Sequence, residues 1–172
     1  MDRLRRRAAL LLFATSGLVY ALDRLTKLWA ERALPGKPIE MIRGVATLRY
    51  TTNSGGAFGL GTSAPWLFAT ATVVVAGVII ATATRHTRTV TAVALGLVLG
   101  GALGNLTDRL VRGDGIVGGR VVDFIDLHVW PVFNLADASI VVGGLLLALW
   151  SWRDGRDPAE PRPRHGASAD DG

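Results

Sequence analysis

Four apolar runs, each close to the thickness of a membrane, constrain this chain more than any other feature. About 20 consecutive apolar residues cross the hydrocarbon of a bilayer as a helix. Of the 172 residues, 49% are hydrophobic and only 19% are charged, which is an unusual balance for a soluble domain. We therefore expect a membrane protein with four transmembrane helices, over residues 8–29, 65–84, 89–107 and 133–152.

The first run follows an RLRRR sequence, a pattern that also resembles a cleavable secretory signal peptide. Three further runs of membrane length nevertheless require a protein with several spans. The third run carries Gly96, Gly100 and Gly104 at intervals of four residues. This spacing places three glycines on one helix face and predicts the close approach of a second helix.

The positions of the basic residues predict the orientation of the helices in the membrane. Lys and Arg gather on the cytoplasmic side of membrane proteins. We therefore expect both termini inside, the connections 30–64 and 108–132 outside, and a disordered cytoplasmic tail over 153–172. The basic residues that carry this expectation are Arg3, Arg5, Arg6 and Arg7, then Arg85 and Arg88, then Arg153, Arg156, Arg162 and Arg164.

The connection after the first run has the alternating pattern of a β-strand. Ala46, Leu48 and Tyr50 alternate with polar residues, and Asn53 begins a turn. We expect a small sheet within about 36–64, lying on the outer membrane surface with its apolar face toward lipid or the helix bundle. The expected fold is an all-α membrane protein with a small extracytoplasmic β-sheet subdomain, formed by residues 1–152 as one domain.

Composition excludes several classes of site. The chain has no Cys and therefore neither a disulfide nor a thiol nucleophile. No two His residues have the spacing of metal ligands, so we expect neither a metal nor another cofactor. The net charge of +5 is assigned to membrane topology and to contact with anionic lipid, because no basic and aromatic residues alternate as on a nucleic-acid surface.

Polar residues at the outer ends of two apolar runs are the main functional signal. An ionisable side chain in a spanning helix costs about 2.5–3.5 kcal/mol, so its presence needs a reason. Asn134 lies three residues before Asp137, and Asn105 lies three residues before Asp108 and four before Arg109. Residues with these spacings share one face of a helix. We expect Asp108 to pair with Arg109 or Arg109 to meet a lipid head group.

A second acidic group stands between apolar neighbours in the sequence VVDFID. Burial and a nearby carboxylate each raise the pKa of an acid, so two carboxyl groups at one site supply an acid and a base at the same pH. Such a pair activates water for attack on a peptide bond. Spacing leaves open whether Asp123 or Asp126 is the partner of Asp137.

Five blocks in order resemble the motifs of the lipoprotein signal peptidases, or signal peptidase II. They are DRLTK (23–27), NSGGAFG (53–59), GGALGNLTDR (100–109), VVDFID (121–126) and FNLADASI (133–140). The resemblance implies a four-helix aspartic endopeptidase that removes signal peptides from diacylglyceryl-modified prolipoproteins just before the lipidated cysteine. It assigns the catalytic pair to Asp123 and Asp137. The residues that it implies as lining or supporting the site are Asp23, Asn53, Gly55, Asn105, Asp108, Arg109 and Asn134.

The chain departs from this family pattern at three places. Arg24 stands where the family usually has Gln, Gly56 stands where it usually has Ala, and the Gly-rich stretch LVRGDGIVGGR is longer than usual. The location implied is the bacterial cytoplasmic membrane, with the active site near the outer face. We further expect a monomer in contact with membrane lipid. The alternatives are a small proton-coupled carrier and a non-catalytic membrane assembly factor.

The orientation gives the first testable prediction. A reporter enzyme that is active only outside the cell, fused to the C-terminus, should give no signal. The reason is the basic cluster at each inner end of the apolar runs. A strong signal from the C-terminal fusion would contradict the orientation.

Overall fold

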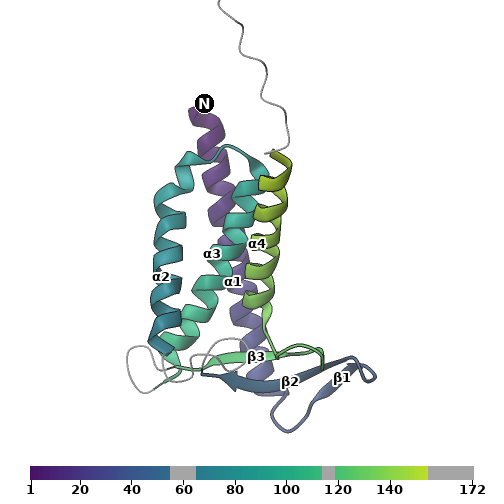
Figure 1. Cartoon of the computed structure of the whole chain (residues 1–172). Coiled ribbons are helices and arrows are strands. Elements are labelled where there is room, and N and C mark those ends of the chain that lie inside the picture. The colour runs from purple at the N-terminus through teal and green to yellow at the C-terminus, as the bar shows by residue number, and fades with distance from the viewer. Residues whose placement is uncertain (55–64, 114–118, 155–172) are drawn as a thin grey trace, which may run out of the picture.

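The computed structural model describes residues 1–54, 65–113 and 119–154. It contains four long helices, one short helical turn and three strands (Figure 1). In chain order these are α1 (Asp2–Ala33), β1 (Ile39–Ile42), β2 (Ala46–Asn53), α2 (Pro65–Thr82), the 3₁₀ turn η2 (Ala83–Arg85), α3 (Thr89–Val111), β3 (Val121–Asp126) and α4 (Leu135–Asp154). The tail beyond residue 154 and the position of Gly56 lie outside the described residues.

Three of the helices, α1, α3 and α4, are long and apolar enough to cross a membrane. The fourth apolar helix found among the described residues, Ala69–Arg85, combines most of α2 with the η2 turn and is shorter. The protein is therefore mostly helical, as the apolar runs predict, with three candidate membrane helices and a fourth apolar helix. Figure 1 shows α3 between the others, with the start of α1 and the end of α4 at the end of the bundle away from the sheet.

The glycine row of α3 packs against α1, which confirms the prediction of a close helix approach. A Cβ atom built on Gly96 would lie 2.6 Å from the Leu12 carbonyl oxygen, and one on Gly100 would lie 2.6 Å from the Ser16 carbonyl oxygen. Real Cβ atoms do not come this near to a backbone oxygen. The third glycine, Gly104, makes room for the carboxylate of Asp23 in the same way.

The three strands form an antiparallel sheet in the order β1–β2–β3 across one end of the bundle (Figure 1). The alternation along β2 has the predicted effect, because Leu48 and Tyr50 pack against a buried cluster of Ala30, Leu34 and Phe124. The apolar face of the sheet thus covers the end of α1. Strand β3 was not expected, since its residues are buried on both faces and do not alternate in polarity.

Two neighbouring glycines in α4 test whether packing or helix propensity controls this bundle. A Cβ on Gly143 would lie 2.7 Å from the Ala94 oxygen of α3, whereas one on Gly144 would meet nothing within 4 Å. We expect Gly143→Ala to destabilise the protein by about 1–3 kcal/mol through overpacking. Gly144→Ala should be neutral or stabilising by up to about 1 kcal/mol through helix propensity. Thermal unfolding in detergent measures both, and equal effects would contradict the close α3–α4 contact.

Candidate active site

The N-terminus of α4 is built by a reciprocal pair of hydrogen bonds between Asn134 and Asp137. The backbone N–H of Asp137 donates to Asn134 Oδ1 (2.9 Å), and the backbone N–H of Asn134 donates to Asp137 Oδ2 (3.3 Å). This is the geometry of a capping box, in which the residue before the helix and the third helical residue satisfy each other's N–H groups. Asn134 therefore lies just outside α4 and fixes the carboxylate of Asp137.

The same asparagine also contacts the second acid of the predicted pair. Asn134 Nδ2 donates a 2.6 Å hydrogen bond to Asp123 Oδ1 and a 3.2 Å hydrogen bond to the Val122 carbonyl. Asp123 lies in β3, is 2% exposed and also accepts a hydrogen bond from the Asn53 side chain. One buried amide thus connects the strand that carries Asp123 to the helix that carries Asp137.

The environment of Asp123 changes its acidity. Burial raises the pKa of this carboxyl group, and the charge of Asp137 raises it further, to about 7. Hydrogen bonds from Asn134 and Asn53 oppose this rise without cancelling it. Asp123 therefore exchanges a proton near neutral pH, as the sequence VVDFID predicts for an acid held among apolar residues.

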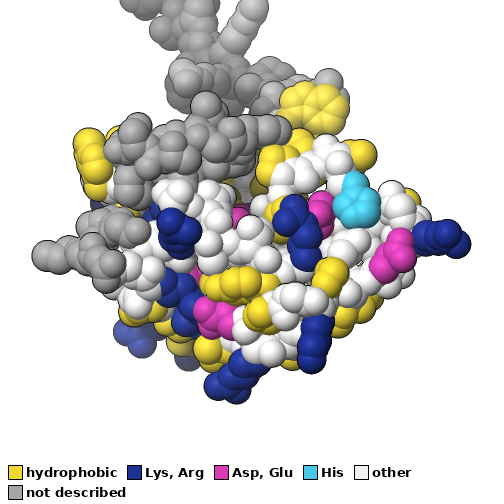
Figure 2. Space-filling model, turned by 90° about the horizontal axis from the view of Figure 1, so that it is seen from below, with side chains coloured by type: hydrophobic (Ala, Val, Ile, Leu, Met, Phe, Trp, Pro, Cys, Tyr) yellow, Lys and Arg dark blue, Asp and Glu magenta, His cyan; other side chains and the backbone are white. Residues whose placement is uncertain are grey.

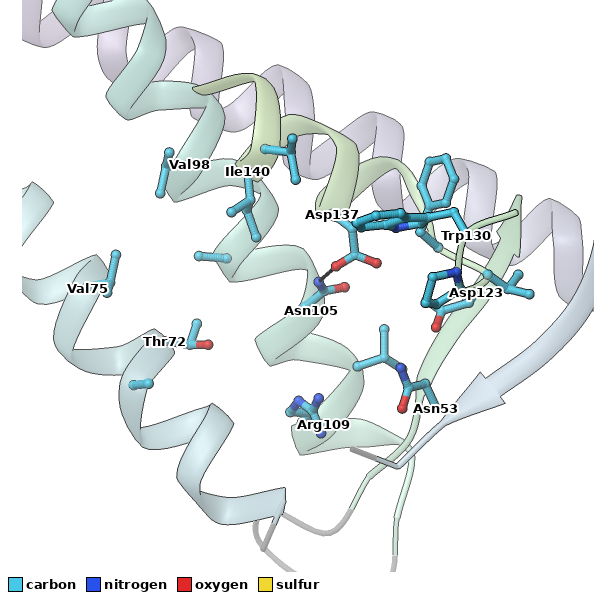
Figure 3. Close-up of a pocket in the computed structure, with 17 residues that line it drawn as sticks. Asn53, Thr72, Val75, Val98, Asn105, Arg109, Asp123, Trp130, Asp137 and Ile140 are labelled. Carbon is cyan, nitrogen blue, oxygen red and sulfur yellow. Dashed lines mark hydrogen bonds between the residues drawn. The ribbon is translucent and has the colours of Figure 1, made fainter. Parts of the chain in front are cut away.

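Asn105 of α3 holds Asp137 from the other side. Its Nδ2 donates to Asp137 Oδ1 (2.8 Å), while its Oδ1 accepts from Lys27 Nζ (2.8 Å) and from Asn134 Nδ2 (3.2 Å). Figure 3 shows the Asn105 amide directed at Asp137. Both polar atoms of the Asn105 side chain are thus hydrogen-bonded to neighbouring side chains, in three hydrogen bonds.

Lys27 is a site residue that the sequence reasoning missed. Its side chain is 0% exposed, and its ammonium forms ion pairs with Asp23 (2.9 Å) and Asp108 (2.8 Å). Asp23 and Lys27 are four residues apart, a spacing that places both on one helix face. That spacing within an apolar helix is the signal that would have identified Lys27.

Asp108 is the acceptor for a wider set of cations. Besides Lys27 it pairs with Arg24 and with Arg112, the latter at 2.7 Å, and Arg112 also pairs with Glu31. Its partners thus come from α1 and from Arg112, the residue just after α3. Arg109 lines the cavity described below.

Asp23 supports the site from α1. Its Oδ1 accepts a 3.0 Å hydrogen bond from the backbone N–H of Ala136, in the first turn of α4. Asp23 therefore satisfies an N–H group that has no partner within the helix. The result is a direct link between α1 and the turn that carries Asp137.

Asp126, which spacing left open as a partner of Asp137, is engaged elsewhere. Its Oδ2 accepts from Arg49 Nε (2.5 Å) and its Oδ1 from the His128 backbone N–H (2.8 Å). The hydrogen bond from Arg49 and the one from His128 lower the pKa of this carboxyl group. The geometry thus separates Asp126 from the network that joins Asp123 and Asp137.

A cavity of about 460 Å³ opens beside Asp123 and Asp137 (Figure 3). Asn53, Asn105 and Arg109 line the same cavity, and its other walls are mostly apolar residues from α2, α3 and α4, among them Val75, Val98 and Ile140. Asp23, Asp108 and Asn134 are not among the lining residues, and Gly55 lies outside the described residues. Among the residues that the structure describes, no three acidic or His side chains are arranged to hold a metal ion.

The fold and the site together define an integral membrane protein with a buried acid pair at one end of its helices. A sequence model of the family described as signal peptidase (SPase) II matches residues 15–153. The chain belongs to the signal peptidase II family. Family membership decides against the two alternatives, a proton-coupled carrier and a membrane assembly factor. The function of the chain is that of a signal peptidase of the bacterial membrane.

Curated relatives and solved structures agree with this assignment. The lipoprotein signal peptidase of Rhodococcus jostii (strain RHA1) is 46% identical over 145 residues, which cover 81% of this chain and 71% of that protein. The lipoprotein signal peptidase of Mycobacterium avium (strain 104) is 42% identical over 154 residues, which cover 87% of this chain and 82% of that protein. A bacterial membrane enzyme solved by the in meso method at 2.3 Å resolution is 25% identical, with a TM-score of 0.78 over 88% of this chain and 93% of that one.

The raised pKa of Asp123 predicts how pH affects stability. A carboxyl group with a raised pKa in the folded protein contributes stability at low pH, and this contribution is lost as pH rises through about 7. Asp123→Asn mimics the protonated acid, so its melting temperature relative to the parent should increase between pH 5 and pH 8. Thermal unfolding in detergent across this range measures the difference.

Asp126→Asn is the control for this measurement, because the pKa of Asp126 is lowered instead. Its stabilising contribution is present at neutral pH and is lost as pH falls through the pKa of the folded state. Asp126→Asn should therefore be less stable than the parent at neutral pH and approach it in acid. Equal pH trends for the two variants would contradict the environments described for these acids.

Proposed function

We propose that the chain is an aspartic endopeptidase that cuts diacylglyceryl-modified prolipoproteins on the N-terminal side of the lipidated cysteine. The catalytic pair is Asp123 and Asp137. The observation that carries the proposal is the position of Asn134, which hydrogen-bonds to Asp123 and to Asp137 beside one cavity. Family membership supports the peptidase activity and the relatives' name supports the substrate class.

Two carboxyl groups that share one proton are sufficient for hydrolysis of a peptide bond. The ionised member accepts a proton from water as the water oxygen attacks the carbonyl carbon, and the protonated member gives its proton to the carbonyl oxygen. The C–N bond then breaks, and the departing amine takes a proton from the pair. The products are a signal peptide with a free carboxyl end and a lipidated cysteine with a free amine. The pKa of Asp123, about 7, suits this exchange.

The neighbouring polar groups orient the reaction. Asn53 and Asn105 line the cavity beside the acids, and because a side-chain amide has two N–H donors, each can bind an acid and also donate to an extended peptide backbone. Arg109 supplies a positive charge at the same cavity, and Asp23, Asp108 and Asn134 hold the reacting side chains from behind. Gly55, two residues after Asn53 in the sequence, is proposed to belong to the same site.

The proposed membrane arrangement is supported by the apolar helices and by the positions of the basic residues. We infer that α2 is the fourth span, that residues 1–152 form one membrane domain, that 153–172 form a cytoplasmic tail, and that the protein acts as a monomer. The start of α1 and the end of α4 lie at the end of the bundle away from the sheet, and both carry Arg residues, which supports a site that faces outward.

The sheet end of the molecule is suited to the surface of a bilayer. Figure 2 shows Lys and Arg, Asp and Glu, and hydrophobic side chains mixed over this face. In the β1–β2 hairpin, Met41, Ile42 and Val45 are exposed. Such a face matches the headgroup region, where a lipidated substrate presents its cleavage site. The apolar walls of the cavity then meet the lipid-bearing part of that substrate.

Substitution of each acid tests the catalytic pair. Asp123→Asn and Asp137→Asn should each lower the rate of signal-peptide release by at least about 10² to 10⁴, because neither amide accepts or donates the required proton. The assay uses purified protein in detergent with a diacylglyceryl-modified prolipoprotein, and both variants should still bind this substrate.

Asp126→Asn is the matched control at a third carboxylate of the same region. It should retain turnover at saturating substrate within about tenfold of the parent, because its carboxylate binds Arg49 and the His128 N–H. Loss of turnover in folded Asp126→Asn with retention in Asp123→Asn would show that the pair is assigned wrongly. Retention in all three variants would exclude an aspartic mechanism.

A further inference from the structure

The loop between β3 and α4 has two sides with different contacts. It is closed at its base by a bridge between Ile125 and Phe133, with N–O distances of 2.9 and 3.0 Å. Its first side, residues 126–128, is attached to β2. Its second side, residues 130–133, lines the cavity that contains Asp123 and Asp137. A contact on the sheet is therefore connected, within one short loop, to a wall of the cavity.

The attachment to β2 joins the side chains of Thr47 and Arg49 in β2 to those of Asp126 and His128. Asp126 pairs with Thr47 across the strands, and its carboxylate binds Arg49 Nε at 2.5 Å and the His128 backbone N–H at 2.8 Å. The ring of His128 lies 3.0 Å from Thr47 Oγ1. We call Arg49, Asp126 and His128 the loop clamp.

The clamp holds a backbone conformation that would not persist unaided. His128 has φ 60°, and the N–H of Val129 donates to the Leu127 carbonyl at 2.8 Å, which makes a γ-turn with positive φ. This turn is rare and strained for a residue with a side chain. Strained residues persist where the surrounding structure holds them, and they gather at functional sites.

The turn directs Trp130 to the mouth of the cavity. The side chain is 57% exposed although it lines the cavity, and Figure 3 shows it beside Asp137. An indole at such a position offers a large apolar surface and one N–H donor at a low cost in conformational entropy. These properties fit the apolar, uncharged part of a peptide next to the bond that is cut.

We propose that Trp130 is a specificity-determining residue that contacts the substrate beside the scissile bond, and that the loop clamp positions it. The proposal rests on the proposed function, because it assumes that the cavity receives the substrate. It also gives Asp126 a role: this acid acts through the loop on substrate binding and takes no part in the chemistry.

Truncation of Trp130 separates substrate binding from turnover. Trp130→Ala should raise KM on the order of tenfold, as truncation of a binding anchor does, with kcat within about threefold of the parent. Trp130→Phe should restore most of the loss, because it keeps an aromatic face. The control is Trp152→Ala, at the far end of α4, where the indole is equally exposed at 58%, and its KM should equal that of the parent.

The clamp is tested by combining variants. Asp126→Asn and Arg49→Gln should each raise KM, and Asp126→Asn combined with Trp130→Ala should raise it no further than Trp130→Ala alone, because both changes remove one contact. At position 128, Gly accepts the positive φ and Val does not, so His128→Val should raise KM more than His128→Gly. Additive effects of Asp126→Asn and Trp130→Ala would overturn the positioning role.

A binding measurement keeps this inference separate from the proposed function. A diacylglyceryl-modified signal peptide is titrated into the Asp137→Asn variant, with and without Trp130→Phe, and intrinsic tryptophan fluorescence is recorded. Trp130→Phe should remove most of the fluorescence change. An unchanged signal, or Trp130→Ala with the KM of the parent, overturns the inference and leaves the acid pair intact. Cleavage that persists in Asp123→Asn and Asp137→Asn overturns the proposed function, whatever Trp130 does.

Discussion

The fully buried ammonium of Lys27 is the interaction on which the sheet end of this bundle depends. Moving a charged group out of water costs several kcal/mol even after relaxation, so it is tolerated only with close partners. The ammonium has three N–H donors, and Asp23, Asp108 and Asn105 supply three acceptors within 2.9 Å. Removal of one partner from such a buried pair is typically destabilising by about 3–5 kcal/mol. Charge satisfaction therefore fixes α1 against α3.

The acids that hold Lys27 extend this constraint to the rest of the site. Asp108 Oδ2 accepts a 3.4 Å hydrogen bond from the Val122 N–H in β3, and Asp23 Oδ1 accepts one from Ala136 in α4. Lys27 also decides which way the Asn105 amide points, since the opposite orientation would place its NH₂ group against the ammonium. The donor side of Asn105 must then face Asp137. A preorganised environment of this kind needs little rearrangement during a reaction.

The sequence predicts those parts of the structure that depend on local patterns. Apolar length gives the helices, the spacing of Gly96, Gly100 and Gly104 gives the close approach of α1, and the alternation along 46–51 gives β2. Strand β3 escapes prediction because burial on both faces removes the alternation that identifies strands. The three-residue spacing of Asn134 and Asp137 is compatible with a capping box. It is equally compatible with two residues on one face of a helix, so the sequence alone does not distinguish the two arrangements.

Contacts between distant segments were beyond the reach of sequence patterns. Nothing local connects Lys27 with Asn105, or Arg49 with Asp126, because these pairs are 78 and 77 residues apart. Spacing alone therefore left Asp123 and Asp126 equivalent as partners of Asp137. In the structure their environments differ. Arg49 of β2 and the backbone N–H of His128 each donate a hydrogen bond to one carboxylate oxygen of Asp126. Asp123 instead accepts hydrogen bonds from Asn134 and Asn53.

The ion pairs around Asp108 explain how the chain accommodates Arg24, which stands where the family usually has Gln. An additional cation beside Lys27 would leave excess positive charge, but Arg24 and Arg112 both pair with Asp108, and Arg112 also pairs with Glu31. Three acids, Asp23, Asp108 and Glu31, thus balance three cations. The buried members Asp23, Lys27 and Asp108 have no exposure, while both arginines and Glu31 are partly exposed. The extra charge lies where water still solvates it, so Arg24 is accommodated without a further uncompensated charge near Asp123 and Asp137.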